Sequence, residues 1–168
     1  MLGCAGSGKS TLSRRLARCF SLPVIHLDQL YFGPGWQPVS SHQFAERIRQ
    51  SANGEGWVMD GNYLNFLPLR LGRATHVVFL DLPRWQCLLS VLWRWWCGRG
   101  KVRTDAAAGC PEKIDRAFLA WIWGYPRRSR PGVLRALEAA RQRGCQVWRV
   151  SSRRELARLW ESWTLQAP

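Results

Sequence analysis

Short apolar runs alternate with longer amphipathic stretches along the whole chain. Each run has the length of a single strand and is bounded by polar or turn residues. The runs cover residues 23–27, 57–60, 75–80 and 146–150. The stretches between them carry apolar residues at helical spacing, over about 10–20, 41–52, 84–96, 111–123, 131–143 and 153–163. This alternation predicts an α/β fold whose parallel sheet is covered on both faces, and the length predicts one domain over 1–168.

Local signals sharpen some of these boundaries. Ser40 or Ser41 can cap the helix that follows it, and Ser152 with Glu155 forms a capping-box pattern. The segment 32–36 contains two glycines and a proline, so it is predicted to be a loop.

A phosphate-binding pattern opens the chain. Residues 3–10 fit G-x-x-x-x-G-K-[ST] at every fixed position, and a predicted helix follows directly. Glycines let the backbone N–H groups point inward at phosphate oxygens, while the lysine reaches the β- and γ-phosphates and the serine hydroxyl can bind Mg²⁺. The predicted nucleotide-binding residues are Gly3, Cys4, Ala5, Gly6, Ser7, Gly8, Lys9, Ser10 and Thr11.

This pattern normally follows a buried strand, but here only Met1 and Leu2 precede it. We therefore expect the first strand to be truncated, and the reading frame to begin upstream of Met1.

Three aspartates each end a predicted strand, where ligand-binding residues of open α/β sheets lie. Asp60 and Asp81 are the candidates for the magnesium shell. Asp60 is favoured because Gly61 permits close approach of a ligand, whereas Asp81 precedes Leu82-Pro83 and can instead cap the next helix. Asp28 can accept a substrate hydroxyl or help to bind magnesium, and the alternative is a turn carboxylate.

Three motifs occur together: GCAGSGKST at the start, WVMDGNY at 57–63 and HVVFLDLP at 76–83. Through them the chain resembles the adenylate-kinase-like branch of P-loop kinases. Within that branch it is most similar to bacterial proteins called DNA topology modulation proteins, through RTDAAAGCPEKIDRAFLAWIW at 103–123 and YPRRSRP at 125–131. The resemblance implies a three-layer fold with a parallel sheet in the order 2-3-1-4-5, binding of ATP and Mg²⁺, and a helical, arginine-bearing lid over about 97–130.

In such kinases the lid arginines neutralise charge on the phosphoryl group that is transferred. Arg99, Arg103 and Arg128 are the predicted catalytic arginines, beside Lys9 and Asp28, and Arg94 is assigned to the nucleotide. Arg127 and Arg130 are further candidates.

One departure from the family pattern bears on the acceptor. Nucleoside-monophosphate kinases typically show D-G-[FY]-P-R where this chain has Asp60-Gly61-Asn62-Tyr63, so the arginine that grips an acceptor monophosphate is absent there. Asp28 is more like the aspartate of kinases that phosphorylate hydroxyls, where it orients or deprotonates the attacking oxygen. The resemblance therefore implies transfer of the ATP γ-phosphoryl group to a small acceptor.

Charge adds a second hypothesis. The net charge is +14, of which residues 84–168 carry +11 and residues 1–83 carry +3. A basic half attracts anions, so the alternative function is a nucleotide-regulated protein that binds DNA or RNA. An arginine-rich composition with no functional cause is the other explanation of the charge.

Other bulk properties exclude several classes of protein. The 46% hydrophobic content argues against disorder, and no apolar run reaches the length of a membrane span. Six scattered cysteines form no C-x-x-C pair, which argues against a zinc ribbon or a thioredoxin-type site. We expect free thiols, and since no signal-peptide pattern is visible we expect a cytoplasmic location.

The chain has 11 tryptophans, and the densest groups lie at residues 93–96 and 121–123. Core packing is the favoured interpretation; stacking on nucleic-acid bases or on adenine, and contact with a membrane surface, are the alternatives. Core packing predicts two buried helix faces, one of Leu88, Leu89, Leu92, Trp93 and Trp96, the other of Phe118, Leu119 and Ile122.

Overall fold

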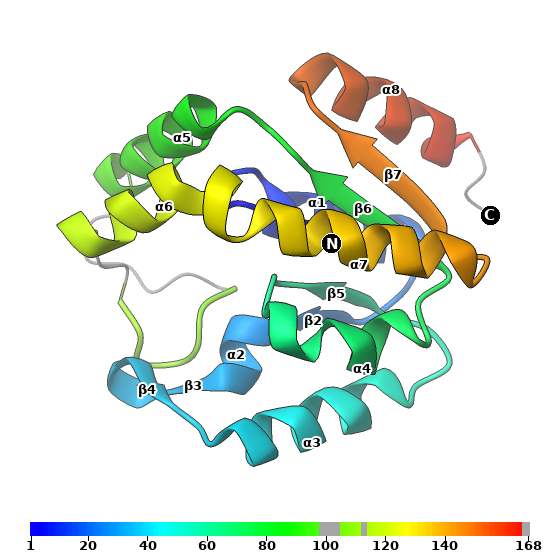
Figure 1. Cartoon of the computed structure of the whole chain (residues 1–168), viewed down its shortest axis with the longest axis horizontal. Coiled ribbons are helices and arrows are strands. Elements are labelled where there is room, and N and C mark those ends of the chain that lie inside the picture. Colours follow the sequence, from blue (N-terminus) through cyan, green and yellow to red (C-terminus); the bar gives the residue numbers. More distant parts are fainter. Residues whose placement is uncertain (98–104, 112–113, 166–168) are drawn as a thin grey trace.

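The computed structural model describes residues 1–97, 105–111 and 114–165 (Figure 1). The strands are β1 (Leu2–Gly3), β2 (Val24–His26), β3 (Phe32–Gly33), β4 (Gln37–Pro38), β5 (Val58–Asp60), β6 (His76–Leu80) and β7 (Gln146–Val150). The α-helices are α1 (Lys9–Cys19), α2 (Leu27–Tyr31), α3 (Ser41–Ala52), α4 (Leu67–Leu71), α5 (Arg84–Cys97), α6 (Arg116–Arg128), α7 (Arg130–Gln142) and α8 (Arg153–Thr164). Short 3₁₀ turns lie at Pro34–Trp36 and Leu64–Phe66.

Two parallel sheets meet near the amino terminus. One has the order β1-β6-β7, with Leu2 opposite Phe79, and the other pairs β2 with β5. The amino group of Met1 donates to the carbonyl of Met59 at 2.6 Å, and the N–H of Gly61 donates to the carbonyl of Met1 at 3.3 Å. These two bonds join Met1 to the end of β5. The predicted α/β class with parallel strands is confirmed.

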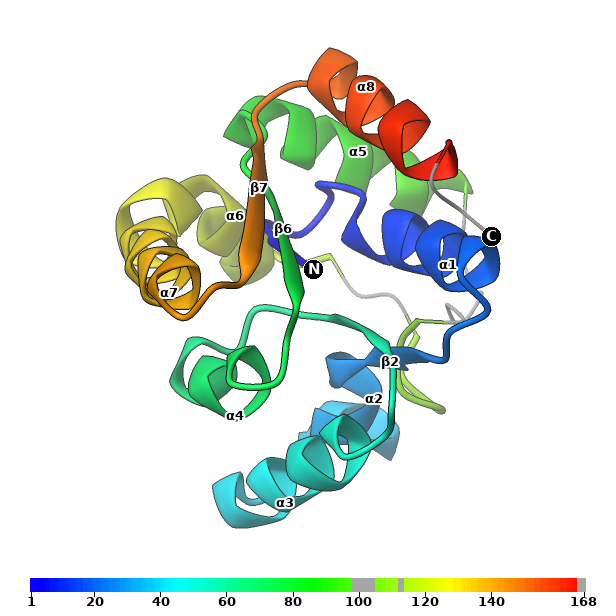
Figure 2. The ribbon, with the colours of Figure 1, turned by 90° about the vertical axis from the view of Figure 1, so that its right-hand side faces the viewer.

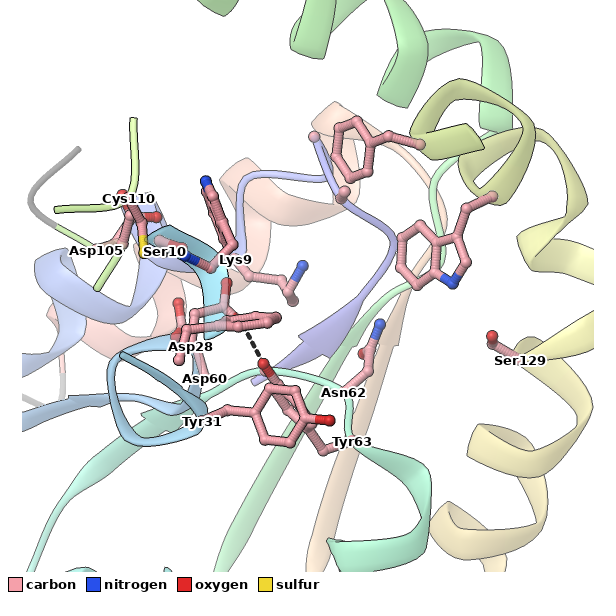
Figure 3. A pocket seen from close by; sticks show the side chains of 18 of the residues that line it. Lys9, Ser10, Asp28, Tyr31, Asp60, Asn62, Tyr63, Asp105, Cys110 and Ser129 are labelled. Atoms are coloured by element: carbon pink, nitrogen blue, oxygen red, sulfur yellow. Dashed lines mark hydrogen bonds between the residues drawn. The ribbon is translucent and has the colours of Figure 1, made fainter. Parts of the chain in front are cut away.

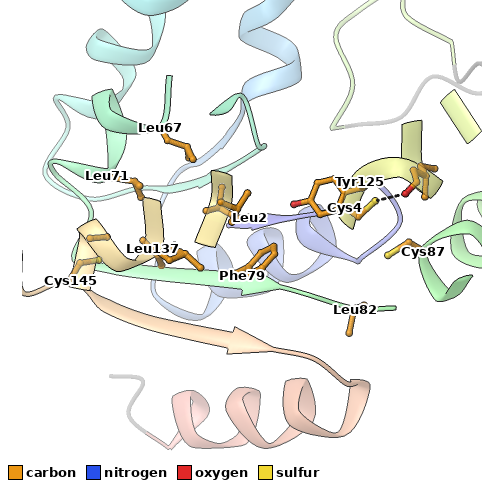
Figure 4. Close-up of a cluster of buried hydrophobic side chains, with 14 of the residues drawn as sticks. Leu2, Cys4, Leu67, Leu71, Phe79, Leu82, Cys87, Tyr125, Leu137 and Cys145 are labelled. Atoms are coloured by element: carbon orange, nitrogen blue, oxygen red, sulfur yellow. Dashed lines mark hydrogen bonds between the residues drawn. The ribbon is translucent and has the colours of Figure 1, made fainter. Parts of the chain in front are cut away.

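Helices cover both faces of the β1-β6-β7 sheet, as alternation along β6 requires. Val78 and Leu80 pack with apolar residues of α1 and α8. Val77 and Phe79 point the other way, into a larger cluster with α4, α6 and α7 (Figure 4). Figure 2 shows α1 and α8 on one side of β6 and β7, and α6 and α7 on the other. The segment of residues 3–8, which we call the phosphate loop after the role predicted for it, thus leaves the sheet between two packed layers of helices.

A third cluster holds α2 and α3 against β5. Its buried members are Leu27, Phe44, Ile48, Ala52 and Met59. Ser40 begins α3 with the predicted cap, because its hydroxyl accepts from the N–H of Gln43 at 3.2 Å. This cluster fixes the position of α2, which carries Asp28.

The segment predicted to be a loop at 32–36 forms a small hairpin. β3 and β4 pair antiparallel around the 3₁₀ turn, in which Gly35 has φ +70° and Trp36 has φ +62°. Gly35 readily adopts the left-handed conformation that this tight turn requires, so the predicted loop is the turn of a hairpin.

The prediction for α5 has nearly the right bounds and the wrong buried face. Cys87 and Val91 are fully buried, and Leu88 is half-buried. The other residues predicted to be buried are exposed, namely Leu89, Leu92, Trp93 and Trp96. In α6, Ile122 is buried as predicted, while Phe118 and Leu119 are half-buried.

Among the described residues, no helix is both long enough and apolar enough to cross a bilayer.

Candidate phosphate-binding site

The loop at residues 3–8 connects β1 to α1 and folds back on itself. The N–H of Ser7 donates to the carbonyl of Cys4 at 3.1 Å. Gly6 has φ +78°, and a Cβ built there would lie 2.2 Å from the carbonyl oxygen of Cys87 on α5. Only glycine fits that position, because a side chain would collide with backbone rather than with a movable side chain. The loop is therefore held in its curled form by packing against α5.

Lys9 lies at the first position of α1 and reaches over this loop. Its Nζ donates to the carbonyl of Cys4 at 3.0 Å. Burial lowers the pKa of Lys9, and the negative charges of Asp60 and Asp28 offset part of that effect. The ammonium group thus stands between the loop and two carboxylates, so an anion bound in the loop would stabilise its charged form.

Asp60 ends β5 and faces the start of α1. Its side chain is 6% exposed, and its Oδ1 accepts a hydrogen bond of 2.9 Å from Nδ1 of His26. Burial on its own would raise the pKa of Asp60, but the hydrogen bond and charge of His26, the Ser10 hydroxyl and Lys9 hold it below its usual range. Its second oxygen, Oδ2, has no hydrogen-bond partner within the described part of the chain. A buried, ionised carboxylate therefore keeps one oxygen available.

Ser10 and Asp60 suit Mg²⁺. Protein sites usually hold this ion through one or two side chains together with waters and substrate phosphates, rather than through a complete cage. Within the described segments, no group of three or more His, Cys, Asp or Glu side chains lies close enough to hold a metal ion. The hydroxyl of Ser10 and the free oxygen of Asp60 are the two groups that fit.

Two residues that the sequence did not single out fix the loop after β5. The side chain of Asn62 pairs with the backbone of Gly3, accepting from its N–H at 3.0 Å and donating to its carbonyl at 2.8 Å. The guanidinium of Arg70, on α4, is buried and donates to the carbonyls of Gly61 and Asn62. Burial lowers the pKa of Arg70 to about 10, so it stays charged at neutral pH. Together they connect the strand end that carries Asp60 to the first residue of the phosphate loop.

Asp28, in the first turn of α2, is held by Tyr63. The Tyr63 hydroxyl donates to Oδ1 of Asp28 at 2.7 Å (Figure 3). Burial and the neighbouring Asp28 carboxylate raise the pKa of Tyr63, which keeps the phenol protonated as a donor. Tyr63 adopts φ +39°, and its ring packs on Tyr31 and Phe44 at centroid distances of 4.9 and 4.8 Å. An aromatic cluster thus sets the orientation of this carboxylate.

Asp81 is engaged elsewhere. Its carboxylate accepts from Nε of Arg130 at 2.8 and 3.0 Å and from Nε of Arg149 at 2.8 Å. Asp81 thereby joins the ends of β6 and β7 to the start of α7. Of the two candidates for magnesium, Asp60 therefore has the available oxygen and Asp81 is paired with two arginines.

A cavity of about 1400 Å³ opens beside the phosphate loop. It is lined by Lys9, Ser10, Asp28, Asp60 and Tyr63, and by residues of the β3–β4 hairpin, α6 and the 105–111 segment (Figure 3). The 105–111 segment belongs to the predicted lid, and it bonds to the hairpin. The N–H of Gly35 donates to Gly109 at 3.1 Å, and the indole N–H of Trp36 donates to Pro111 at 3.0 Å.

A second, smaller cavity of about 510 Å³ lies between α1, α5 and α8. Its walls include Trp160, whose ring lies 4.1 Å below the guanidinium of Arg15. The two cavities share four lining residues, namely Gly6, Gly8, Thr11 and Arg94. They therefore meet at the phosphate loop.

The arginines predicted to act on the phosphates do not all lie at the cavities. Arg94 lies where the two cavities meet. Arg128 turns back on α6, donating to the carbonyls of Ala120 and Trp121 at 3.1 and 3.2 Å, and does not line either cavity. Arg99 and Arg103 lie outside the described residues.

All six cysteines are free, as expected.

Searches with this chain matched no protein-family model, no curated protein and no solved structure.

Proposed function

We propose that this protein binds ATP at the loop of residues 3–10 and transfers its γ-phosphoryl group to a hydroxyl of a small acceptor. The observation that carries the proposal is the meeting of two cavities at the phosphate loop. A phosphotransferase needs two substrates that approach the transferring group from opposite sides. The proposed architecture is that of the adenylate-kinase-like kinases, with β2, β5, β1, β6 and β7 as one sheet in the order 2-3-1-4-5.

The phosphates are assigned to the curled loop and the start of α1. Backbone N–H groups of the loop donate to phosphate oxygens, and the N-terminal end of the 11-residue α1 adds its positive potential. Lys9, which now donates to the loop's own carbonyl, turns to the β- and γ-phosphates. Ser10 and Asp60 hold Mg²⁺, which offsets negative charge on the phosphates.

The nucleoside is assigned to the smaller cavity. Trp160 and Arg15 form a planar wall on α8 and α1, and aromatic and guanidinium planes both stack on nucleobases. Arg94 lies at the junction, where it faces the phosphates.

The acceptor is assigned to the larger cavity, with Asp28 as the general base. The acceptor oxygen forms a bond to the γ-phosphorus as the bond from that phosphorus to the β,γ-bridging oxygen breaks. The hydroxyl proton passes to Asp28, and ADP is released. Tyr63 holds the carboxylate in place through its 2.7 Å hydrogen bond.

The partners of Asn62 and Tyr63 support a hydroxyl acceptor over a monophosphate. At the [FY]-P positions of the monophosphate-kinase pattern, Asn62 bonds to Gly3 and Tyr63 bonds to Asp28. The next position, where those kinases have the arginine for the acceptor phosphate, is Leu64. Both side chains bond to other residues of the protein. Residues 62 and 63 therefore position the site, and the acceptor is bound by Asp28.

The test is ATP consumption with Mg²⁺ against a panel of nucleoside monophosphates, nucleosides and small hydroxyl compounds. A hydroxyl compound is expected to stimulate turnover, and Asp28→Asn is expected to lower that turnover by about 10²–10⁴-fold, the usual contribution of a general base. Glu55→Gln, which changes an exposed acid elsewhere, is the matched control and should leave turnover unchanged.

Two results contradict the proposal. If Asp28→Asn retains full acceptor-stimulated turnover, Asp28 is not the base. If ATP binds but no acceptor stimulates turnover, and the chain binds DNA or RNA with an affinity that falls steeply with salt, the nucleotide-regulated nucleic-acid-binding function takes its place.

A further inference from the structure

One face of α5 exposes a continuous apolar stripe. Residues 85, 89, 92, 93 and 96 recur at helical spacing and therefore lie on one side of the helix. Their exposed fractions are 55% for Trp85, 58% for Leu89, 43% for Leu92, 71% for Trp93 and 65% for Trp96. Exposed apolar residues scattered singly are ordinary, but a contiguous row of three tryptophans and two leucines marks a contact surface. We call these five residues the α5 stripe.

Arginines flank the α5 stripe on both sides. Towards α6, the guanidinium of Arg84 lies 3.7 Å above the ring of Trp123, which is itself 50% exposed. Towards α8, Arg153 donates to the hydroxyl of Ser90 at 3.4 Å. No acidic residue occurs between Leu82 and Cys97, and the half of the chain that contains α5 carries a net charge of +11. The surface is thus apolar along its centre and positive along its edges.

We propose that the α5 stripe docks this protein onto a membrane surface that contains anionic lipids. Tryptophan rings are favoured at the level of the headgroups, because they combine a large apolar face with one polar N–H. Leucines between them enter the acyl boundary, and arginines at the edges pair with lipid phosphates. α5 has 14 residues, so it lies in the plane of the interface and does not cross it.

Two other occupants fit less well. A second copy of the chain would bring two molecules of net charge +14 together through faces that both have arginines at their edges. A nucleic acid would be bound by the arginines. However, none of the five side chains of the α5 stripe carries a positive charge, and Leu89 and Leu92 have no ring that could stack on a base. An anionic bilayer complements both the apolar centre and the positive edges.

The experiment is flotation of the full chain with two kinds of vesicle, phosphatidylcholine alone and phosphatidylcholine with about one-third phosphatidylglycerol. The wild type is expected to float with the anionic vesicles. The double variant Trp93→Ser with Trp96→Ser should lower the partition coefficient by at least about tenfold, because it removes the two most exposed rings of the α5 stripe. These two side chains are mostly in solvent, so the variant should stay folded, which its urea unfolding curve checks.

Leu165→Ser is the matched control. Leu165 is 87% exposed and lies after α8, outside the α5 stripe, so its loss should leave flotation unchanged. The proposal is overturned if the wild type does not float with anionic vesicles or if the double variant floats as well as the wild type. It is also overturned if light scattering shows a dimer that the double variant abolishes while flotation is absent, or if the double variant loses DNA or RNA binding instead of lipid binding. None of these readouts depends on the proposed phosphotransfer.

Discussion

Replacement of Asn62 by alanine tests how the phosphate loop is held. The Asn62 amide makes two hydrogen bonds to Gly3, of 3.0 and 2.8 Å, and so imitates the pairing of a neighbouring strand. The alanine variant removes both bonds while Arg70 still holds the backbone of residues 61 and 62. We expect the phosphate loop to lose its hydrogen bonds to residue 62 while the fold is retained.

The magnitude follows from the surroundings of Gly3. A neutral hydrogen bond contributes about 1 kcal/mol net, and a buried group left without a partner costs about 1–3 kcal/mol. Gly3 is buried, whereas Asn62 is half-buried, so water can enter part of the space that the amide leaves. We therefore expect Asn62→Ala to lower the free energy of unfolding by about 2–3 kcal/mol, near the lower end of the cost for two unpaired groups.

Urea unfolding followed by tryptophan fluorescence measures this loss. The midpoint should fall while the slope m stays constant, because the surface exposed on unfolding is nearly unchanged. Asn65→Ala is the matched control: Asn65 is exposed in the same cavity, and its loss should change stability by less than about 0.5 kcal/mol. Equal midpoints for Asn62→Ala and Asn65→Ala would refute the claim that the amide of Asn62 holds the loop.

Two further predictions concern the carboxylates. Tyr63→Phe removes the hydrogen bond to Asp28 but keeps the ring, so it should lower the free energy of unfolding by about 1–2 kcal/mol in urea titrations; an unchanged midpoint would show that the bond does not stabilise the site. The pKa of Asp60 lies below its usual value, so its contribution to stability is present above about pH 4 and is lost as the pH falls through the folded-state value. Asp60→Asn should therefore lose less stability than the wild type as the pH falls below about 4, and equal losses would contradict that assignment.

Local patterns in the sequence predicted much of the fold. The strand at 146–150 and the helix over 41–52 have their predicted bounds, because alternation and a serine cap are encoded within a few residues. The glycine spacing of the loop and the position of Asp60 at a strand end are equally local. Each of these features depends on residues that are near one another in the sequence, and the structure places the loop and Asp60 together.

Contacts between distant segments could not be predicted in the same way. Arg70 lies in the short helix α4, and no local pattern in the sequence indicates that its side chain is buried against the carbonyls of residues 61 and 62. α5 shows a different limit. It is apolar on two sides, at Cys87 and Val91 as well as along the α5 stripe, so hydrophobic spacing alone cannot tell which side faces the core.

The central claim is that residues 3–10 bind the phosphates of ATP, and calorimetric titration of ATP with Mg²⁺ tests it most directly. Lys9→Ala should weaken binding by at least about tenfold, since a charge-assisted hydrogen bond contributes about 1.5–3 kcal/mol. Arg18→Ala removes one positive charge from an exposed position on the same helix and should leave the affinity nearly unchanged. Binding that is weakened only by Lys9→Ala is the result predicted here. ATP affinity that is the same for the wild type and Lys9→Ala would contradict the account.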